Sequence, residues 1–184
     1  MPHGDRDEEQ FTHSWCHGGT GTSYLFLALH AAGVDDVGGR GPLEWYERCL
    51  CSVRESGLPQ RLRPGFWDND GRCCGTAGVG DAFLDAVQFE GSRLALDDPM
   101  SFAAELAETL VARARHNSAG VYWQFLEHRN DPSLLPPHPG FFQGAAGIAA
   151  FLFRAARVIH QGSRAPRVSR PDALPFLAAT GRHP

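Results

Sequence analysis

Cys73-Cys74-Gly75-Thr76-Ala77-Gly78 is the stretch that decides the fold, because two other segments of the chain repeat its pattern. Each copy contains two glycines three residues apart and is followed by an apolar run. The other copies are Cys16-His17-Gly18 leading into Gly21, and Phe142-Gln143-Gly144 leading into Gly147. The first glycines of the three copies, at positions 18, 75 and 144, lie 57 and 69 residues apart. This spacing fits a repeat built from helical hairpins.

The segments that follow and separate the three motifs carry apolar residues at helical spacing, with charged residues on the opposite face. Two of these segments have a proline near their start, Pro42 and Pro99, as first helical turns often do. Glycines typical of C-terminal caps follow helical stretches at Gly33, Gly57 and Gly91. We therefore expect an all-α fold with two helix pairs and a final single helix: residues 19–32 with 43–55, 76–90 with 99–115, and then 145–160.

Two long connectors, residues 57–72 and 117–142, contain prolines that exclude regular helix. Connectors of this length usually border a site or hold a short strand pair, and residues 121–125 are the better strand candidate. From residue 163 onward the chain is rich in Arg and Pro. We expect three regions: a flexible N-terminus over residues 1–13, one helical metal-binding domain over 14–162, and a poorly ordered tail over 163–184.

The composition, with 42% hydrophobic and 21% charged residues, is ordinary for one folded domain. A net charge of −4 with interspersed signs provides no clustered basic face, so neither nucleic acid nor an anionic membrane is an expected partner. The first ten residues are polar, and no later stretch approaches the ~18 apolar residues of a membrane span. The expected location is therefore the cytoplasm.

The five cysteines are an odd number in a chain without an export signal, which favours metal binding or buried thiols over disulfides. Superposing the motifs places Cys16, Cys73 and Phe142 at one equivalent position, and His17, Cys74 and Gln143 at the next. If equivalent helices stand side by side, Cys16, Cys73 and Cys74 meet at one end. Three thiolates with a fourth tetrahedral position open are the arrangement of catalytic zinc. We also expect the nearby helix starts to lower the thiol pKa values.

The third motif has no ligand-type side chain, so its glycines are best explained by tight helix packing. Cys49 and Cys51 lie two apart on a predicted helix and point to different faces, which favours core packing over ligation. A four-thiolate structural site that includes Cys49 is the less favoured alternative.

Polar residues near the motifs have more than one interpretation. Asp68, Asp70 and Arg72 precede Cys73, where a carboxylate can act as a base, hydrogen-bond the site or form a turn, and turn formation is favoured. A second polar group in the long connector either contacts a peptide or forms a solvated surface: Glu127, His128, Arg129 and Asp131. Three tryptophans either line a rim or, as is more common, pack in the core: Trp15, Trp67 and Trp123.

Ser14-Trp15-Cys16-His17-Gly18 and Cys73-Cys74-Gly75-Thr76-Ala77-Gly78 resemble the two zinc motifs of lanthionine synthetase C-like proteins. Gln143-Gly144-Ala145-Ala146-Gly147 resembles the closing glycine motif of that family, so the resemblance covers roughly residues 14–160. The second motif of the family has Cys followed by His, whereas this chain has Cys73-Cys74. It is similar in this respect to the three-cysteine variant among cyclase domains of bifunctional lanthipeptide synthetases. The resemblance implies Zn²⁺ bound by Cys16, Cys73 and Cys74.

The resemblance also implies the chemistry of lanthipeptide biosynthesis, in which a peptide Cys thiolate adds to dehydroalanine or dehydrobutyrine and forms a thioether. The implied partner is a peptide with Cys and dehydrated Ser or Thr. His17 lies closest in sequence to a ligand and is the candidate proton donor, or alternatively a hydrogen-bond partner that supports the ligands.

The family fold is an (α/α) toroid of seven helical hairpins, and this chain has about three of the seven repeat openings. We therefore expect a partial toroid, incomplete as a cyclase, whose exposed repeat edges favour association. The alternative function is a zinc-containing scaffold or peptide-binding module without turnover. A carbohydrate-active toroid needs two positioned carboxylates, and the sequence offers no convincing pair.

Overall fold

The computed structural model of the chain describes residues 12–60, 69–89, 94–126 and 134–173. Within these residues the fold is mostly helical, as predicted. Five α-helices are present: α1 (Gly19–Ala31), α2 (Pro42–Arg54), α3 (Thr76–Gln88), α4 (Pro99–Arg113) and α5 (Ala145–Gln161). The smaller elements are β1 (Arg115–Asn117), β2 (Gly120–Tyr122), β3 (Phe125–Leu126), β4 (Leu134–Leu135) and the 3₁₀ turn η1 (Gly162–Arg164). No described helix combines the length and apolarity needed to cross a membrane.

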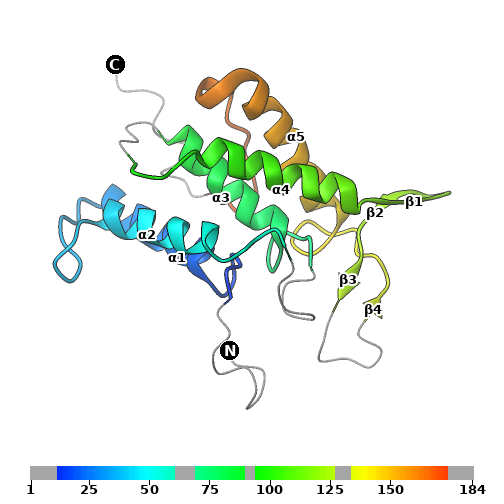
Figure 1. The fold of residues 1–184 in the computed structure, drawn as a ribbon, viewed down its shortest axis with the longest axis horizontal. Coiled ribbons are helices and arrows are strands. Elements are labelled where there is room, and N and C mark those ends of the chain that lie inside the picture. Colours follow the sequence, from blue (N-terminus) through cyan, green and yellow to red (C-terminus); the bar gives the residue numbers. More distant parts are fainter. Residues whose placement is uncertain (1–11, 61–68, 90–93, 127–133, 174–184) are drawn as a thin grey trace, which may run out of the picture.

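Helix α3 is the centre of the molecule (Figure 1). Helix α1 packs on α2 and α4 packs on α3, while α5 contacts both α3 and α4. Every residue of α3 except Val87 is buried. Because α3 is covered on all sides, it has no solvent-facing polar stripe of the kind that surface helices carry.

The helix boundaries follow the signals in the sequence. Pro42 and Pro99 lie in the first turns of α2 and α4, where a missing N–H costs no intrahelical hydrogen bond. Gly33 and Gly57 follow α1 and α2 with φ angles of 76° and 88°, in the left-handed region that glycine tolerates. Gly91 lies outside the described residues.

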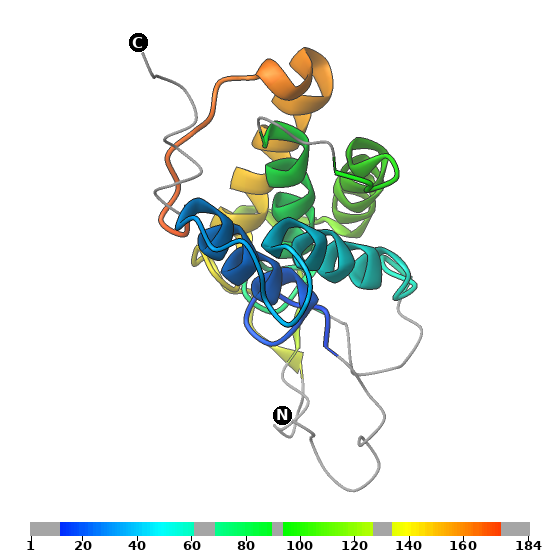
Figure 2. The ribbon, with the colours of Figure 1, turned by 90° about the vertical axis from the view of Figure 1, so that its left-hand side faces the viewer.

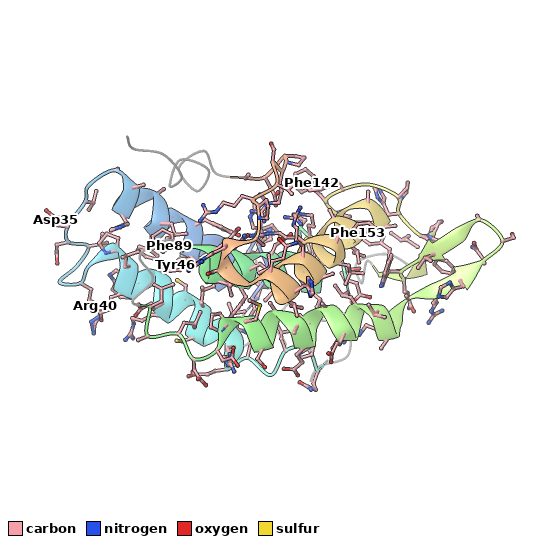
Figure 3. The ribbon with its side chains drawn as sticks, turned by 90° about the horizontal axis from the view of Figure 1, so that it is seen from above. Asp35, Arg40, Tyr46, Phe89, Phe142 and Phe153 are labelled. Atoms are coloured by element: carbon pink, nitrogen blue, oxygen red, sulfur yellow. The ribbon has the colours of Figure 1, made fainter. Side chains whose placement is uncertain are left out.

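Helix α2 buries its apolar face against α1 and the end of α3, and α4 buries its apolar face against α3. The fully buried side chains of these two faces include Tyr46, Leu50, Val53, Leu106 and Leu110. The rings of Tyr46 and Phe89 lie next to each other, with centroids 6.5 Å apart (Figure 3). These contacts fix both helix pairs around one apolar core.

The connector after α4 contains two short antiparallel pairs, β1 with β2 and β3 with β4. The single strand expected over residues 121–125 is divided between β2 and β3. The interruption occurs at Trp123, whose side chain is only 8% exposed and whose Nε1–H donates to the Leu110 carbonyl at 2.8 Å. Trp123 therefore belongs to the core, as the commoner interpretation of the tryptophans holds, and its burial separates the two strands. Trp67 lies outside the described residues.

Charged side chains form a buried ionic network between α3, α5 and the residues after α5. Its members are Arg72, Asp81, Asp85, Arg154, Arg170 and Asp172. Arg154 of α5 contacts Asp81 at 2.7 Å and Asp85 at 2.6 Å. Three cations and three anions balance each other, which is the condition under which buried charges are tolerated.

Residues 162–173, which we call the C-terminal segment, lie against α3 through this network. Residues 163–173 of this segment belong to the tail that the sequence suggests is poorly ordered. Arg170 and Asp172 are only 10% and 8% exposed. The Arg-rich composition that suggests disorder here supplies the counter-ions for the carboxylates of α3. Residues 1–11 and 174–184 lie outside the described part of the chain.

Candidate metal centre

The three glycine motifs start α1, α3 and α5 in the same way. In the second copy, Thr76 N–H donates to the Asn69 carbonyl at 3.3 Å. In the third copy, Ala145 N–H donates to the His138 carbonyl at 2.9 Å, again seven residues back. The second and third loops thus fold over their helix starts and satisfy N–H groups that have no partner within the helix. In the first copy, the Thr20 hydroxyl donates to the His13 carbonyl at 2.5 Å, again seven residues back.

The second glycine of each motif allows this loop to approach. A methyl group at Gly21, Gly78 or Gly147 would overlap the carbonyl oxygen of the residue six positions earlier. Those carbonyls belong to Trp15, Arg72 and Phe141. Close packing therefore explains the glycines in all three copies, including the third, for which it is the favoured explanation from sequence.

Backbone hydrogen bonds join the three loops in order. Cys16 N–H donates to the Cys73 carbonyl at 3.2 Å, and Cys73 N–H donates to the Phe142 carbonyl at 2.7 Å. These are the three residues that superposition of the motifs makes equivalent. The interaction repeats from loop to loop and brings the first two loops together with their cysteines facing each other.

The thiols of Cys16, Cys73 and Cys74 converge on one point. The Sγ atoms of Cys16 and Cys74 lie 3.1 Å apart, those of Cys74 and Cys73 lie 3.4 Å apart, and all three fall within 4.8 Å of one another. All three cysteines are free thiols, at separations well above the ~2.05 Å of a disulfide. Among the described residues, no other group of three metal-ligating side chains comes this close.

This donor set fits a tetrahedral metal ion. Three sulfurs bound at about 2.3 Å in a tetrahedron lie about 3.8 Å from one another. The observed separations of 3.1 and 3.4 Å reach that value with sub-ångström outward shifts. Thiolate sulfur selects zinc and other soft ions over magnesium or calcium. Three protein donors leave a fourth tetrahedral position for another ligand.

The electrostatics of the thiols differ from the sequence-based expectation. Burial raises the pKa of Cys73. Burial raises the pKa of Cys74 further, together with hydrogen bonds that its thiol makes to the sulfurs of Cys16 and Cys73. The effect of the helix starts is therefore outweighed by desolvation and by the cost of placing like charges together. A divalent cation reverses this balance, because a coordinating thiol is deprotonated outright.

Ser14 is a part of the centre that motif spacing did not single out. Its side chain is 3% exposed, and its Oγ accepts a hydrogen bond from His17 N–H at 3.2 Å. The same Oγ lies 3.5 Å from Cys16 Sγ, within hydrogen-bond range of a sulfur. Ser14 can therefore orient Cys16. Its position two residues before the cysteine, in the turn, was the available signal.

Other sequence candidates occupy different places. His17 is exposed and adjoins Cys16. Cys49 and Cys51 of α2 are half-buried and are not members of the thiol cluster. Burial raises the pKa of both thiols, as expected for cysteines that pack rather than react.

The acidic residue nearest the second loop has a structural contact. Asp70 is 3% exposed and pairs with Arg113 of α4 at 2.9 Å. Arg113 also donates to the Pro59 carbonyl at 2.8 Å, so the pair anchors the loop to α4. Five candidates lie outside the described residues: Asp68, Glu127, His128, Arg129 and Asp131.

The family model for lanthionine synthetase C-like proteins matches residues 2–158, which include all three loops and the thiol cluster. The chain belongs to the lanthionine synthetase C-like family. Comparison with curated proteins gives no match. The lanthionine synthetase C-like match ends within α5, so the C-terminal segment follows it in the sequence.

Proposed function

We propose that Cys16, Cys73 and Cys74 bind one Zn²⁺, in the three-cysteine variant of the family site, and that the chain acts in thioether formation on a peptide. The observation that carries this proposal is the convergence of three thiols from two loops, within 4.8 Å of one another. Members of the lanthionine synthetase C-like family bind zinc, and the match includes all three cysteines. The open fourth position is where a substrate thiol fits.

Zinc in this position supplies Lewis acidity that lowers the pKa of a peptide Cys thiol. The side chains of the protein bind the ion, orient one of its ligands and transfer a proton. Cys16, Cys73 and Cys74 hold the ion, and Ser14 orients Cys16 through its hydroxyl. His17 is our candidate for the group that gives a proton to the carbon next to the carbonyl after thiol addition. Its backbone is fixed by Ser14 while its side chain is exposed beside Cys16.

Aromatic side chains next to the thiols support a peptide as the substrate. The rings of Trp15 and Phe142 lie with centroids 6.2 Å apart, and Phe142 is 44% exposed. These residues belong to the first and third loops, whose backbones are bonded to Cys73 on either side. They offer apolar surface to a peptide that brings its Cys to the open position.

The ordered hydrogen bonds between the three loops favour a partial toroid as the architecture of the chain. Helices α1, α3 and α5 begin with equivalent loops that are hydrogen-bonded in order, as inner helices around a common axis would be. Helices α2 and α4 then occupy the outer positions of two hairpins. We assign the described part of the chain about three of the seven repeats of the family fold.

The metal site is tested by measuring zinc per chain in the purified full-length protein. About one zinc per chain is expected, and Cys16→Ala, Cys73→Ala and Cys74→Ala should each reduce it sharply. Cys49→Ala and Cys51→Ala are the matched controls, because these cysteines lie outside the cluster. Unchanged zinc in the Cys74→Ala protein would refute the three-thiolate site.

The activity is tested with a peptide that contains one Cys and one dehydroalanine. Ring closure does not change the peptide mass, so it is followed by the loss of a thiol that can be alkylated. We expect the full chain alone to cyclise the peptide slowly, because a cavity that positions both reactants contributes strongly to such reactions and we assign the chain only about three of the seven repeats. Cys16→Ala should give no cyclisation. Metal binding without any cyclisation would leave a zinc-containing peptide-binding module.

A further inference from the structure

The C-terminal segment runs back along α3 toward the metal-binding loops (Figure 2). Its contacts occur in order: the Ala165 carbonyl accepts from Gln88 Nε2 at 2.7 Å, Arg170 contacts Asp85 at 2.9 Å, and Asp172 contacts Arg72 at 2.6 Å. The partner numbers fall as the segment numbers rise. The segment is therefore antiparallel to α3 and ends beside the residue that precedes Cys73.

Arg72 connects this segment to the metal centre. Its side chain is 2% exposed, and its guanidinium is paired with Asp81 and Asp172. The guanidinium carbon lies 4.8 Å from the ring centroid of Phe141, in the third loop. The Arg72 carbonyl packs against Gly78 in the first turn of α3. Both the side chain and the backbone of Arg72 are thus fixed, and the next peptide unit carries a ligand.

Of the two carboxylates that pair with Arg72, Asp172 is shared with fewer other cations: besides Arg72 its described ion pairs include one with Arg170, at 3.6 Å. Asp81 also pairs with Arg154 and Arg170, so its charge is divided among three arginines. Without the Asp172 charge, the buried ionic network would hold three cations and two anions. A buried guanidinium with an excess of like charges around it moves toward water. Such a movement of Arg72 displaces Cys73.

We propose that Asp172 and Arg72 are positioning residues of the metal centre, through which the C-terminal segment sets the placement of Cys73 and Cys74. This inference rests on the proposed metal function of the three cysteines. Neither residue touches the thiols by side chain in the described contacts, and each acts through the loop backbone. The segment thus extends the functional unit past the family match, which ends at residue 158.

The test is Co²⁺ and Zn²⁺ binding by the full-length Asp172→Asn protein. Asparagine keeps the shape of the side chain and removes its charge. We expect Co²⁺ affinity to fall about tenfold, at the lower end of the range seen when partners of ligands are removed. We also expect the thiolate-to-cobalt absorption band to shift, because the sulfur geometry changes. Far-UV circular dichroism should remain that of the wild type.

Two control variants separate positioning from general effects. Asp97→Asn makes the same change at a carboxylate that is 93% exposed, and its Co²⁺ affinity should equal that of the wild type. Val158→Ala removes buried volume from α5 outside the buried ionic network and should lower stability without changing affinity or the absorption band. If Asp172→Asn does not fold, Asp172→Glu replaces it, because it keeps the charge and displaces it by one methylene. It should lower Co²⁺ affinity by less than removal of the charge does, with a shifted band.

The outcomes distinguish this inference from the metal function. Wild-type affinity and an unchanged absorption band in Asp172→Asn, or in Asp172→Glu where that variant replaces it, would overturn the positioning role alone. An equal loss of affinity in Val158→Ala would also overturn it, because the effect would then follow stability. Failure of the wild-type protein to bind either ion would overturn the metal site itself and this inference with it.

Discussion

The loops before α3 and α5 have the same backbone and different chemistry. Both fold back over their helix start with a hydrogen bond to the carbonyl seven residues earlier, and both pack a carbonyl against a glycine of the first turn. The second loop carries Cys73 and Cys74, whereas the third carries Phe142 and Gln143 at the equivalent positions. The comparison teaches that the glycine motif builds the helix start and that the two side chains before it decide whether the loop can offer metal ligands.

Substitution at the equivalent position of each loop should have the largest difference in effect. Cys73→Ala should weaken Zn²⁺ binding by more than about 100-fold, because the loss of a ligand exceeds the loss of a partner of a ligand. Phe142→Ala should leave zinc binding unchanged, since the thiols remain. Competition with a chromophoric chelator measures both affinities. A large loss of zinc affinity in Phe142→Ala would show that the third loop also controls the metal.

Replacing the packed glycine should affect both loops alike. Gly78→Ala and Gly147→Ala each force a methyl group against a carbonyl oxygen and should lower the free energy of unfolding by about 3 kcal/mol. Chemical denaturation measures the change. Gly41→Ala is the control, because a Cβ there meets its nearest atom at an ordinary 3.8 Å and should change stability by less than about 1 kcal/mol. Stability unaffected in Gly147→Ala alone would break the equivalence of the loops.

The ion pair between Asp70 and Arg113 anchors the second loop to α4, and the described contacts of the third loop include no such ion pair to α4. Arg113→Met removes the ion pair with the buried Asp70 and the hydrogen bond to Pro59. The free energy of unfolding should fall by about 1–2 kcal/mol, a value reduced because Arg113 is 22% exposed. Arg115→Met, at an exposed arginine that bonds Gln124, should change stability by less than about 0.5 kcal/mol. Thermal unfolding compares the two variants.

The smallest expected effect concerns the first loop, which has Ser14 where the second and third loops have Gly71 and Gly140. Ser14→Ala removes the hydroxyl near Cys16 Sγ and should weaken metal binding by about fivefold, equivalent to about 1 kcal/mol. Ser23→Ala makes the same change at a buried serine that bonds Thr20 within α1, and it should leave metal affinity unchanged. Equal affinities in the two variants would remove Ser14 from the centre.

Much of the fold could be predicted because its signals are local. The repeated glycines, Pro42 and Pro99 locate the helices to within a few residues, since caps and first turns depend on neighbouring residues only. The same repeat identified the three cysteines that the structure brings together.

The buried ionic network could not be predicted in this way. Asp81 and Asp85 are one helical turn apart on α3, where like charges repel each other. Arg72 lies nine residues before Asp81 and pairs with it, but their other cations come from α5 and from the C-terminal segment, more than 60 residues later in the sequence. The composition of an Arg- and Pro-rich segment does not predict which part of the fold it packs against. The repelling pair of carboxylates was the only local sign that cations from elsewhere in the chain were required.

The hydrogen bond between Cys16 and Cys73 has a consequence for how the molecule opens. It joins two helix pairs whose cysteines are separated by 57 residues of chain. A metal ion held by thiols from both pairs is a reversible cross-link, and closing a loop of this length costs about 3–4 kcal/mol of chain entropy in the unfolded state. We therefore expect metal loading to slow amide hydrogen exchange in α1 and α2 relative to α4 and α5, because separation of the first helix pair would then require release of the ion.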